Sequence, residues 1–568
     1  MARLFNEHLI RNVTSLSGAW NFKTDPDNNG LNEKWFNGLN DAHTVIVPSV
    51  WNTEFGMLGY EGVCWYEKKF FFEGNLKLSF GAVMTECDVW LDGEKIGYHY
   101  GGFSEFALFV PELKSGWHNL ILRVSNAFDK KSIPQIKVDW YHYGGITRDV
   151  EAERLSGIVI LGHKLKYELN SDFDTATTEP EIEIYNSENH TVSTTVCYYI
   201  GDTLCHSGNI TLGAHEISTV KCDAFSLENI KLWDVFEPNL YTVKITTDTD
   251  DLYDRVGFRK VDVSKDGIIL NGKNLEIRGV NRHEEHPEFG FAFPPQLMKR
   301  DIDIIIDLGC NSVRGSHYPA SRIFMDMIDE AGLLYWSEIP MWGWGFSTEA
   351  LADPDVIERG CEMHREMTKY YYNHPSIIIW GMHNEIHTEC EVSVPLTRKY
   401  YGILKENGGN RIVTYATDKP LKDLCLEYCD LISINSYFGW YEGDMFEWEK
   451  FLDKFHKRRI DLNLTDKPIL FSEFGAAALY GHHTFDNIHW TEEYQANVLE
   501  HALNLFHADD ACCGFYIWQF CDIRTCLEAG INRARGFNNK GILNEQRKPK
   551  AAYHKVKELY HAFAKNRK

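Results

Sequence analysis

The chain has 568 residues, more than one hydrophobic core can organise, so about two to four domains are expected. Its composition, with 44% hydrophobic and 25% charged residues, is that of a globular protein. The formal charge of −24 argues against nucleic acid or an anionic membrane surface as a partner, because both require a cationic face.

The chain carries no targeting or membrane signal that we recognise. Its first residues lack the apolar core of a signal peptide, and no stretch approaches the ~20 apolar residues of a membrane span. We therefore expect a cytoplasmic protein, provided that the natural chain does not begin earlier. The 14 cysteines show no paired CxxC spacing, so buried free thiols are expected.

The first half of the chain reads as β-strands. Short runs of alternating polar and apolar residues occupy 63–72, 76–83 and 88–97. Asp92-Gly93 between two such runs predicts a hairpin, since glycine tolerates the positive φ of a tight turn. From about residue 161 the strands continue in a more polar chain, which predicts a second, smaller β-sandwich ending near residue 261.

From residue 262 to residue 568 the pattern changes to apolar strand-like runs that alternate with amphipathic helical runs. Helical patterns cover 296–309, 321–332 and 492–506. The eight strand candidates are 275–283, 311–319, 333–340, 376–385, 411–418, 431–441, 467–475 and 514–522. This count favours a (β/α)₈ barrel, although a doubly wound open sheet could alternate in the same way.

Polar and titratable residues follow the apolar part of nearly every strand candidate. In a barrel the active site lies at the C-terminal ends of the strands, so these residues predict a functional rim. In chain order they are Asn281, Arg282, His283 and Glu284; Ser316, His317 and Tyr318; Trp336, Ser337 and Glu338; His383, Asn384 and Glu385; Asn435, Ser436 and Tyr437; Ser472, Glu473 and Phe474; Trp518 and Asp522.

Two of these residues, Glu385 and Glu473, suit the cleavage of a glycosidic bond. That reaction needs one carboxylic acid to protonate the leaving oxygen and one carboxylate on the other side of the anomeric carbon. Glu385 ends the fourth strand candidate and Glu473 the seventh, so both side chains can meet across the barrel mouth. Either glutamate alone could equally be a structural ion-pair partner.

Several motifs, in this order, resemble glycoside hydrolase family 2. They are GVNRHEEHP, RGSHYP, WSEIP, SIIIWGMHNE and KPILFSEFG in the predicted barrel. DGEKIGYHYGGFSEF is similar to the jelly-roll sugar-binding domain of that family, and LWDVFEPNLY to its immunoglobulin-like domain. The resemblance implies a jelly-roll β-sandwich at 1–160, an immunoglobulin-like β-sandwich at 161–261 and a catalytic (β/α)₈ barrel at 262–568.

By this resemblance Glu385 is the general acid/base and Glu473 the nucleophile of a retaining enzyme. Asn384 would bind the sugar's 2-hydroxyl, Tyr437 would bond near the nucleophile, and His317 and Trp518 would line the sugar pocket. Tyr437 could instead be a rim aromatic packed on a neighbour, and His317 a core histidine. No cofactor is implied, and a homo-oligomer, dimer or tetramer, is expected.

The segment after the last strand candidate, RARGFNNKGILNEQRKPKAA, resembles the part of the β-glucuronidases of this family that grips a sugar carboxylate. The matching residues are Asn538 and Lys540, assisted by either Arg533 or Arg535; the alternative is that this segment is an ordinary solvated loop. NSYFGWY is similar to the strand-six segment of the same enzymes and implicates Tyr441 beside Tyr437.

KVDWYHYGGITR looks like a loop that sends an aspartate, here Asp139, toward a sugar hydroxyl. The implied substrates are small-molecule or oligosaccharide glucuronides. The same motifs leave open a β-galacturonidase or β-galactosidase, because glucuronate and galacturonate share the carboxylate and differ only at C4. A non-catalytic carbohydrate-binding protein is a further alternative, against which the two glutamates argue.

His283 and His286 are three residues apart after a strand, whereas a helical zinc site needs histidines four apart, so no metal is expected.

After the third strand candidate the chain enters the next helix almost directly, which predicts an open mouth of the barrel. Trp342 and Trp344 could form an aromatic platform there, or pack onto the barrel.

Overall fold

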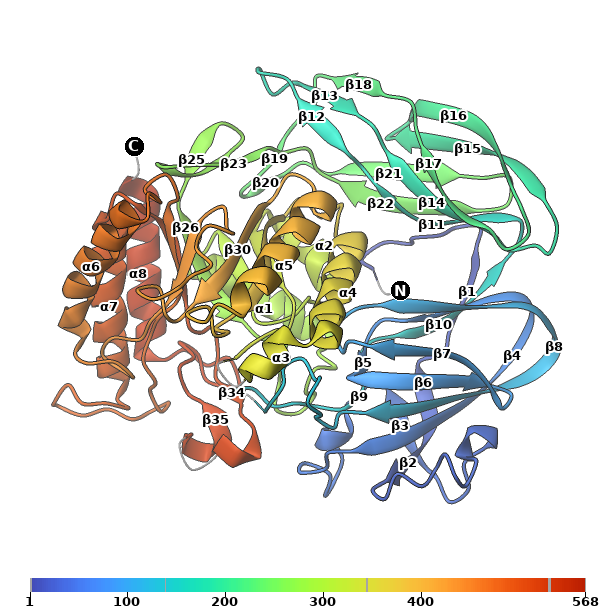
Figure 1. Ribbon diagram of the computed structural model, residues 1–568, viewed down its shortest axis with the longest axis horizontal. Coiled ribbons are helices and arrows are strands. Elements are labelled where there is room, and N and C mark those ends of the chain that lie inside the picture. Colours follow the sequence, from blue (N-terminus) through green and yellow to red (C-terminus); the bar gives the residue numbers. More distant parts are fainter. Residues whose placement is uncertain (1–2, 138, 344–345, 530–532, 567–568) are drawn as a thin grey trace.

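The N-terminal sandwich is an eight-stranded antiparallel sheet in the computed structural model of the chain, which describes residues 3–137, 139–343, 346–529 and 533–566 (Figure 1). A further two-stranded ladder pairs β5 (Val83–Met84) with β9 (Gly145–Ile146). The eight strands are β1 (Asn12–Ser15), β2 (Gly18–Asp25), β3 (His43–Val47), β4 (Val63–Phe80), β6 (Glu86–Leu91), β7 (Glu94–Tyr100), β8 (Phe106–Ser125) and β10 (Val150–Leu155).

The two longest strands, β4 and β8, pair along their lengths and show why the alternating pattern forms a sandwich. Phe70 and Phe72 are buried in the core, while Phe71 between them faces outward. The predicted hairpin is confirmed: β6 pairs with β7, and Asp92 and Gly93 both have positive φ, 51° and 85°.

The second sandwich lies above the first in Figure 1 and consists of three small antiparallel sheets. Their orders are β11-β14-β17, β12-β13-β18 and β16-β15-β21-β22. The strands are β11 (Ile158–Lys164), β12 (Tyr167–Leu169), β13 (Thr175–Thr178), β14 (Glu181–Asn186), β15 (Val192–Ile200), β16 (Thr203–Leu212), β17 (Ile217–Lys221), β18 (Phe225–Glu228), β21 (Tyr241–Thr246) and β22 (Asp251–Val256).

The C-terminal part is a closed barrel of eight parallel strands in chain order, and the closure of β26 on β33 excludes the open sheet. The predicted fold class is therefore confirmed. The barrel strands are β26 (Ile277–Arg282), β27 (Ser312–Gly315), β28 (Leu334–Glu338), β29 (Ile377–Asn384), β30 (Ile412–Thr417), β31 (Ile432–Asn435), β32 (Ile469–Glu473) and β33 (Cys512–Ile517).

Two strands end earlier than their apolar runs. β31 ends at Asn435 and β33 at Ile517, so Tyr437, Tyr441 and Trp518 lie on loops at the mouth. The Trp518 N–H, for example, donates to the carbonyl of Phe474 on a neighbouring loop. The sequence pattern could not mark these ends, because the aromatic loop residues continue the apolar run.

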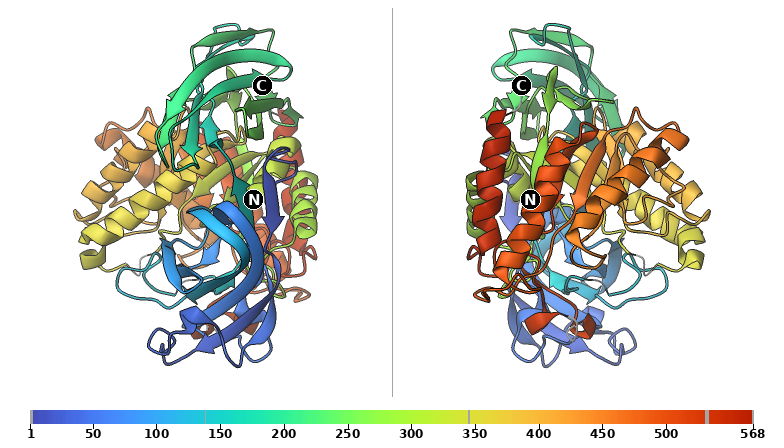
Figure 2. Two further views of the ribbon diagram at one scale, coloured as in Figure 1. Left: turned by 90° about the vertical axis from the view of Figure 1, so that its right-hand side faces the viewer. Right: turned by 90° about the vertical axis from the view of Figure 1, so that its left-hand side faces the viewer.

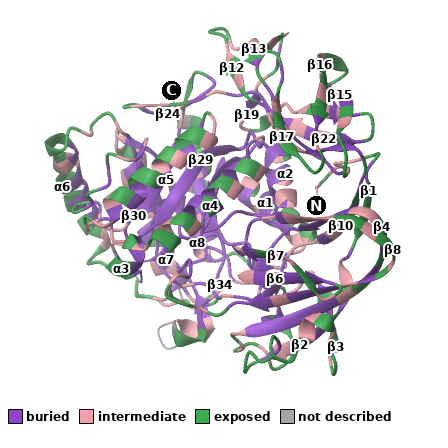
Figure 3. Ribbon diagram, turned by 45° about the vertical axis from the view of Figure 1, so that its right-hand side comes forward, coloured by how far each residue is buried: buried purple, intermediate pink, exposed green. Residues whose placement is uncertain are grey.

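Helices surround the barrel, with buried inner faces and exposed outer faces (Figures 2 and 3). Local signals set their ends: the Ser321 hydroxyl caps α2 by accepting from Phe324 N, and Gly332 ends it with a φ of 64°. The helices are α1 (Pro295–Asp307), α2 (Arg322–Ala331), α3 (Thr348–Ala352), α4 (Pro354–Tyr370), α5 (Ser393–Asn407), α6 (Trp448–Asp461), α7 (Glu492–Ala508) and α8 (Ala551–Asn566).

Within the described residues, none of the helices combines the length and the apolar character needed to cross a bilayer. All 14 cysteines are free and most are buried, as predicted.

Short strands in small sheets complete the fold. They are β19 (Trp233–Asp234), β20 (Glu237–Pro238), β23 (Val261–Ser264), β24 (Gly267–Leu270), β25 (Lys273–Leu275), β34 (Ile523–Arg524) and β35 (Phe537–Asn538).

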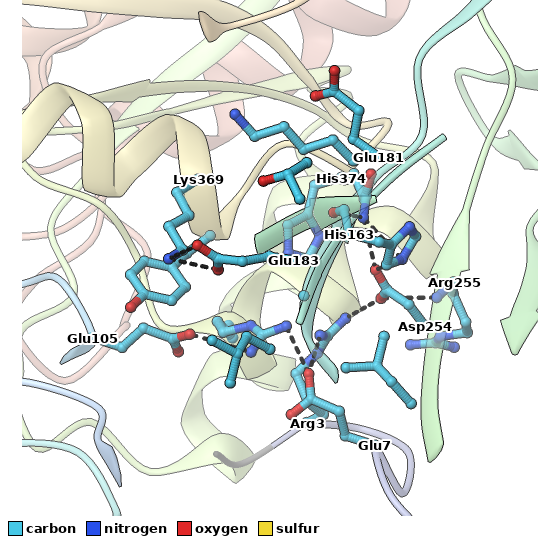
Figure 4. A pocket seen from close by; sticks show the side chains of 18 of the residues that line it. Arg3, Glu7, Glu105, His163, Glu181, Glu183, Asp254, Arg255, Lys369 and His374 are labelled. Carbon is cyan, nitrogen blue, oxygen red and sulfur yellow. Dashed lines mark hydrogen bonds and ion pairs between the residues drawn. The ribbon is translucent and has the colours of Figure 1, made fainter. Parts of the chain in front are cut away.

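The N-terminal arm, residues 3–11, contacts all three parts of the protein through two arginines with buried side chains, Arg3 and Arg11. Arg3 pairs with Asp326 of α2 and Asp254 of β22, each at 2.9 Å. Figure 4 shows Arg3 with Glu7 and Asp254 in a polar pocket of about 330 Å³ at this junction. Arg11 joins the two sandwiches, since its guanidinium bonds Glu153 of β10 at 2.7 Å and Asp250 at 2.5 Å.

We predict that Arg11→Met lowers stability strongly, because Asp250 and Glu153 would remain buried without this partner. Removing one member of a buried pair costs about 3–5 kcal/mol. The midpoint of thermal unfolding should fall by several degrees, measured by circular dichroism. Lys265→Met is the control, since its pair with Asp266 is 72% and 63% exposed and should contribute little. Equal midpoints for the two variants would contradict the role of Arg11.

Candidate active site

The carboxylate of Glu473 is held at the C-terminal end of β32 by two donors. Its Oε1 accepts from Nη1 of Arg314 at 2.7 Å, and its Oε2 accepts from the hydroxyl of Tyr437 at 2.7 Å. The residue is 3% exposed at the barrel mouth. One cationic and one neutral donor stabilise its negative charge and fix the direction of both oxygens.

Arg314 on β27 is the centre of the site, although it is not among the residues predicted from the strand ends. Besides Glu473, its guanidinium donates to Glu338 at 2.9 Å and to the side-chain oxygens of Asn384 at 2.7 Å and Asn281 at 3.0 Å. It is fully buried and lies 4.6 Å from the ring centroid of Trp336. The signal was present in the sequence, because an arginine inside an apolar barrel strand requires carboxylates nearby.

Glu385 follows β29 and has a different environment from that of Glu473. Burial raises the pKa of its carboxyl group well above the usual range, and the charges of Glu473 and Asp418 raise it further. Its Oε1 accepts from Nδ2 of Asn435 at 2.7 Å, and its backbone has a φ of 54°. The left-handed conformation turns the side chain away from the strand direction, and Glu385 N–H donates to the carbonyl of Ala416 at 3.0 Å.

A chain of hydrogen bonds connects the two glutamates. The Asn435 amide donates to Glu385 and, at 3.2 Å, to the Asn384 side-chain oxygen, which also accepts from Arg314. Arg314 then bonds Glu473. Within the described residues, Nδ2 of Asn384 is buried and has no hydrogen-bond partner. A ligand hydroxyl at this position would satisfy it.

His317 and Trp518 form one wall of the site. Their rings stack with centroids 5.2 Å apart, and His317 Nδ1 lies 2.6 Å from Glu338. Burial, with the charge of Arg314, lowers the pKa of His317 to about 3, so the ring is neutral. Glu338 is fully buried beside Arg314, and burial raises its pKa to about 7. Glu338 thus contacts both Arg314 and His317 and helps to hold their side chains in place.

Lys540 is a buried cation without a carboxylate partner in the described part of the chain. Its ammonium donates to the hydroxyl of Tyr441 at 2.5 Å and lies 4.4 Å from that ring's centroid. The residue is 1% exposed, and burial lowers its pKa. An unpaired buried charge is costly, so this geometry favours an anionic ligand.

The remaining predicted residues of this region gather beside Lys540, with one exception. Asn538 donates to the Asp139 carboxylate at 3.1 Å, and Arg533 pairs with the same carboxylate through Nε at 3.0 Å. Arg535 instead pairs with Glu545 at 2.9 Å and is half-exposed. The structure thus brings Arg533 to the site and leaves Arg535 outside it.

The segment after β28 is short, since the chain reaches α3 at Thr348. Trp342 does not offer an exposed platform: it is 9% exposed and packs edge-to-face on Trp140, with centroids 5.7 Å apart. Trp344 lies outside the described residues. Within those residues, the two carboxylate–histidine groups with metal-like spacing include neither His283 nor His286.

Comparison with known proteins identifies the family. Residues 261–565 match "Glycosyl hydrolases family 2, TIM barrel domain", residues 159–259 match "Glycosyl hydrolases family 2", and residues 13–155 match its "sugar binding domain". A β-glucuronidase of Paenibacillus borealis is 26% identical over 96% of both chains.

Two solved structures show the same architecture over the full length. A family 2 β-galacturonidase of Eisenbergiella tayi, bound to galacturonate, is 33% identical with a TM-score of 0.92 and covers 99% of both chains. A β-glucuronidase of Ruminococcus gnavus is 26% identical with a TM-score of 0.86 and the same coverage.

The state of Glu385 predicts the alkaline limb of the pH profile. A general acid must be protonated, so kcat/KM should fall as the pH rises through the raised pKa of Glu385. In Glu385→Gln this limb should disappear, and substrates with poor leaving groups should lose the most activity. An unchanged alkaline limb in the variant, measured with an aryl glycoside, would assign the titration to another group.

Proposed function

The chain belongs to glycoside hydrolase family 2, and we propose that it is a retaining β-glycosidase that releases a uronic acid, in the first instance β-D-glucuronic acid. The observation that carries the choice of a uronic acid is Lys540, a buried ammonium without a carboxylate partner in the described residues. A sugar carboxylate bound there would supply the missing charge. Asn538 beside it offers an amide.

In the proposed reaction, Glu473 attacks the anomeric carbon while Glu385 protonates the oxygen of the leaving group. The result is a covalent glycosyl-enzyme, which water then hydrolyses with Glu385 as the base. Arg314 and Tyr437 would hold the Glu473 side chain in place, with one donor on each carboxylate oxygen. The Asn384 amide would bind the 2-hydroxyl, a contact that strengthens in the transition state.

A β-galacturonidase is the second candidate, and a specific observation favours it. The galacturonate-bound enzyme of Eisenbergiella tayi is more similar in sequence and structure than the Ruminococcus gnavus β-glucuronidase, with 33% against 26% identity. The two sugars differ only in the orientation of the hydroxyl at C4, next to the carbon that carries the carboxylate. Asp139 and Arg533, adjacent to Asn538, are the groups expected to distinguish them.

Glu473→Gln should abolish nearly all turnover while leaving the fold intact, because the amide cannot form the covalent intermediate. In the wild type, a 2-fluoro uronide should label the peptide KPILFSEFG, detected by mass spectrometry. Labelling of a different carboxylate, or near-normal rates in the variant, would refute Glu473 as the nucleophile.

Lys540→Ala should act selectively on uronides. A charge-assisted hydrogen bond contributes about 1.5–3 kcal/mol, so kcat/KM for a nitrophenyl uronide should fall by roughly 10–200-fold or more. Any activity on a neutral β-glucoside or β-galactoside should fall far less, since a hydroxymethyl group leaves no carboxylate unpaired.

The same assays with the wild type compare the nitrophenyl β-glucuronide with the β-galacturonide and so choose between the two candidates. Equal damage to charged and neutral substrates in Lys540→Ala would make the residue structural. A wild-type preference for neutral galactosides would refute the choice of a uronic acid but not the two-glutamate mechanism.

A further inference from the structure

We infer that Asp418 and Lys419, with Glu389 and Glu442 beside them, form the leaving-group side of the site and select a neutral, hydroxyl-bearing sugar as the group released. These four residues are called the charged rim. The inference rests on the proposed function, because it takes Glu385 as the acid that protonates the leaving oxygen. The leaving group must then lie on the side of the site where Glu385 meets its neighbours.

Asp418 lies near Glu385 at the barrel mouth. It follows β30, which pairs with β29, and Asn384 is opposite Ala416 in the register of the two strands. The Glu385 N–H is anchored on the Ala416 carbonyl. Because the strands are parallel, Asp418 lies two residues further toward the mouth than this anchor. The charge on Asp418 contributes to the raised pKa of Glu385, in keeping with two carboxyl groups that are close together.

The rest of the charged rim comes from three loops. Both carboxylate oxygens of Asp418 accept from Nζ of Lys419 at 2.8 Å, and these side chains are only 27% and 25% exposed. The same ammonium lies 4.0 Å from Oε2 of Glu389, on the loop after β29. Glu442, on the loop after β31, accepts a hydrogen bond from Tyr437 N–H at 3.2 Å. The charge of Asp418 adds to the effect of burial in raising the pKa of Glu442.

Buried hydrogen bonds fix the two loops that carry most of the charged rim. The Thr388 hydroxyl donates to Asp423 at 2.7 Å, and Leu424 N–H donates to the Thr388 carbonyl at 2.9 Å. These contacts join the loop after β29 to the loop after β30. A leaving group therefore meets polar groups that are already in place, which reduces the entropy lost on binding.

The chemistry of the charged rim suits one class of leaving group. A sugar hydroxyl can donate to the carboxylate of Asp418 and accept from the ammonium of Lys419. An aromatic leaving group without hydroxyl groups cannot donate to Asp418 and would remove water from a charged pair without fully replacing its hydrogen bonds. The charged rim has three carboxyl groups and one ammonium, so its net charge is negative once the carboxyl groups are ionised, and a sulfated or uronic second sugar would then be repelled.

The test compares a disaccharide, in which the uronic acid is β-linked to a neutral hexose, with the nitrophenyl glycoside of the same uronic acid. In Asp418→Ala the ratio of kcat/KM for the disaccharide to that for the aryl substrate should fall by about 10–200-fold. The pH is set below the alkaline limb, so that Glu385 is protonated in every variant. Asp461→Ala removes the same charge from the exposed end of α6 and should leave the ratio unchanged.

A second measurement uses the wild type alone and does not depend on the folding of a variant. A neutral second sugar should be preferred over a uronic or sulfated one by about tenfold or more in kcat/KM. An unchanged ratio in Asp418→Ala, or a preference for the anionic second sugar, overturns the role of the charged rim while the aryl uronide activity still supports the proposed function. Failure of the wild type to cleave any uronide overturns both.

Discussion

The buried guanidinium of Arg314 is the interaction on which the site depends. Burial alone would lower its pKa, but the charges of Glu338 and Glu473 outweigh this effect and hold the pKa above its ordinary value. The cation is therefore permanent, and it organises four side chains from four other strands: Glu473, Glu338, Asn384 and Asn281. A lysine could not do this, because it lacks the planar fork of donors that contacts several acceptors in fixed directions.

The same cation helps to give the two glutamates different electrostatic environments. Glu473 lies against Arg314 and Tyr437, whereas Glu385 receives an amide donor and faces the negative charges of Glu473 and Asp418. Burial and these negative charges raise the pKa of Glu385 well above the usual range, so this carboxyl group tends to keep its proton. This difference is what a double displacement needs at its start, with one carboxylate to attack and one carboxylic acid to donate a proton.

The sequence predicted the fold and the strand ends that meet at the barrel mouth, but it did not predict which side chains contact one another there. Eight apolar runs found the barrel strands, and reading their ends located Glu385 and Glu473, because a parallel barrel brings all strand ends to one mouth. Arg314 was missed since it lies within a strand rather than at its end. Arg533 and Arg535 could not be told apart, because their directions depend on pairing with Asp139 and Glu545, far away in the chain.

The docking of the N-terminal sandwich onto the barrel contributes to the geometry of the candidate site. Asp139 belongs to the N-terminal part of the chain, yet it bonds Arg533 and Asn538 of the barrel. The backbone of Tyr141 holds the same loop by donating to the carbonyl of Arg524 at 2.9 Å. A shift of the sandwich would therefore move Asp139 relative to Lys540.

The buried arm at the three-part junction limits such a shift, since Arg11 joins the two sandwiches and Arg3 joins the second sandwich to the barrel. Both arginines lie in ion pairs whose loss is expensive, so the junction has few alternative arrangements of comparable energy. The ion pairs at the junction and the geometry of the candidate site at the mouth are thus linked. The proposed uronate site would lose its geometry if the arm let the sandwich move.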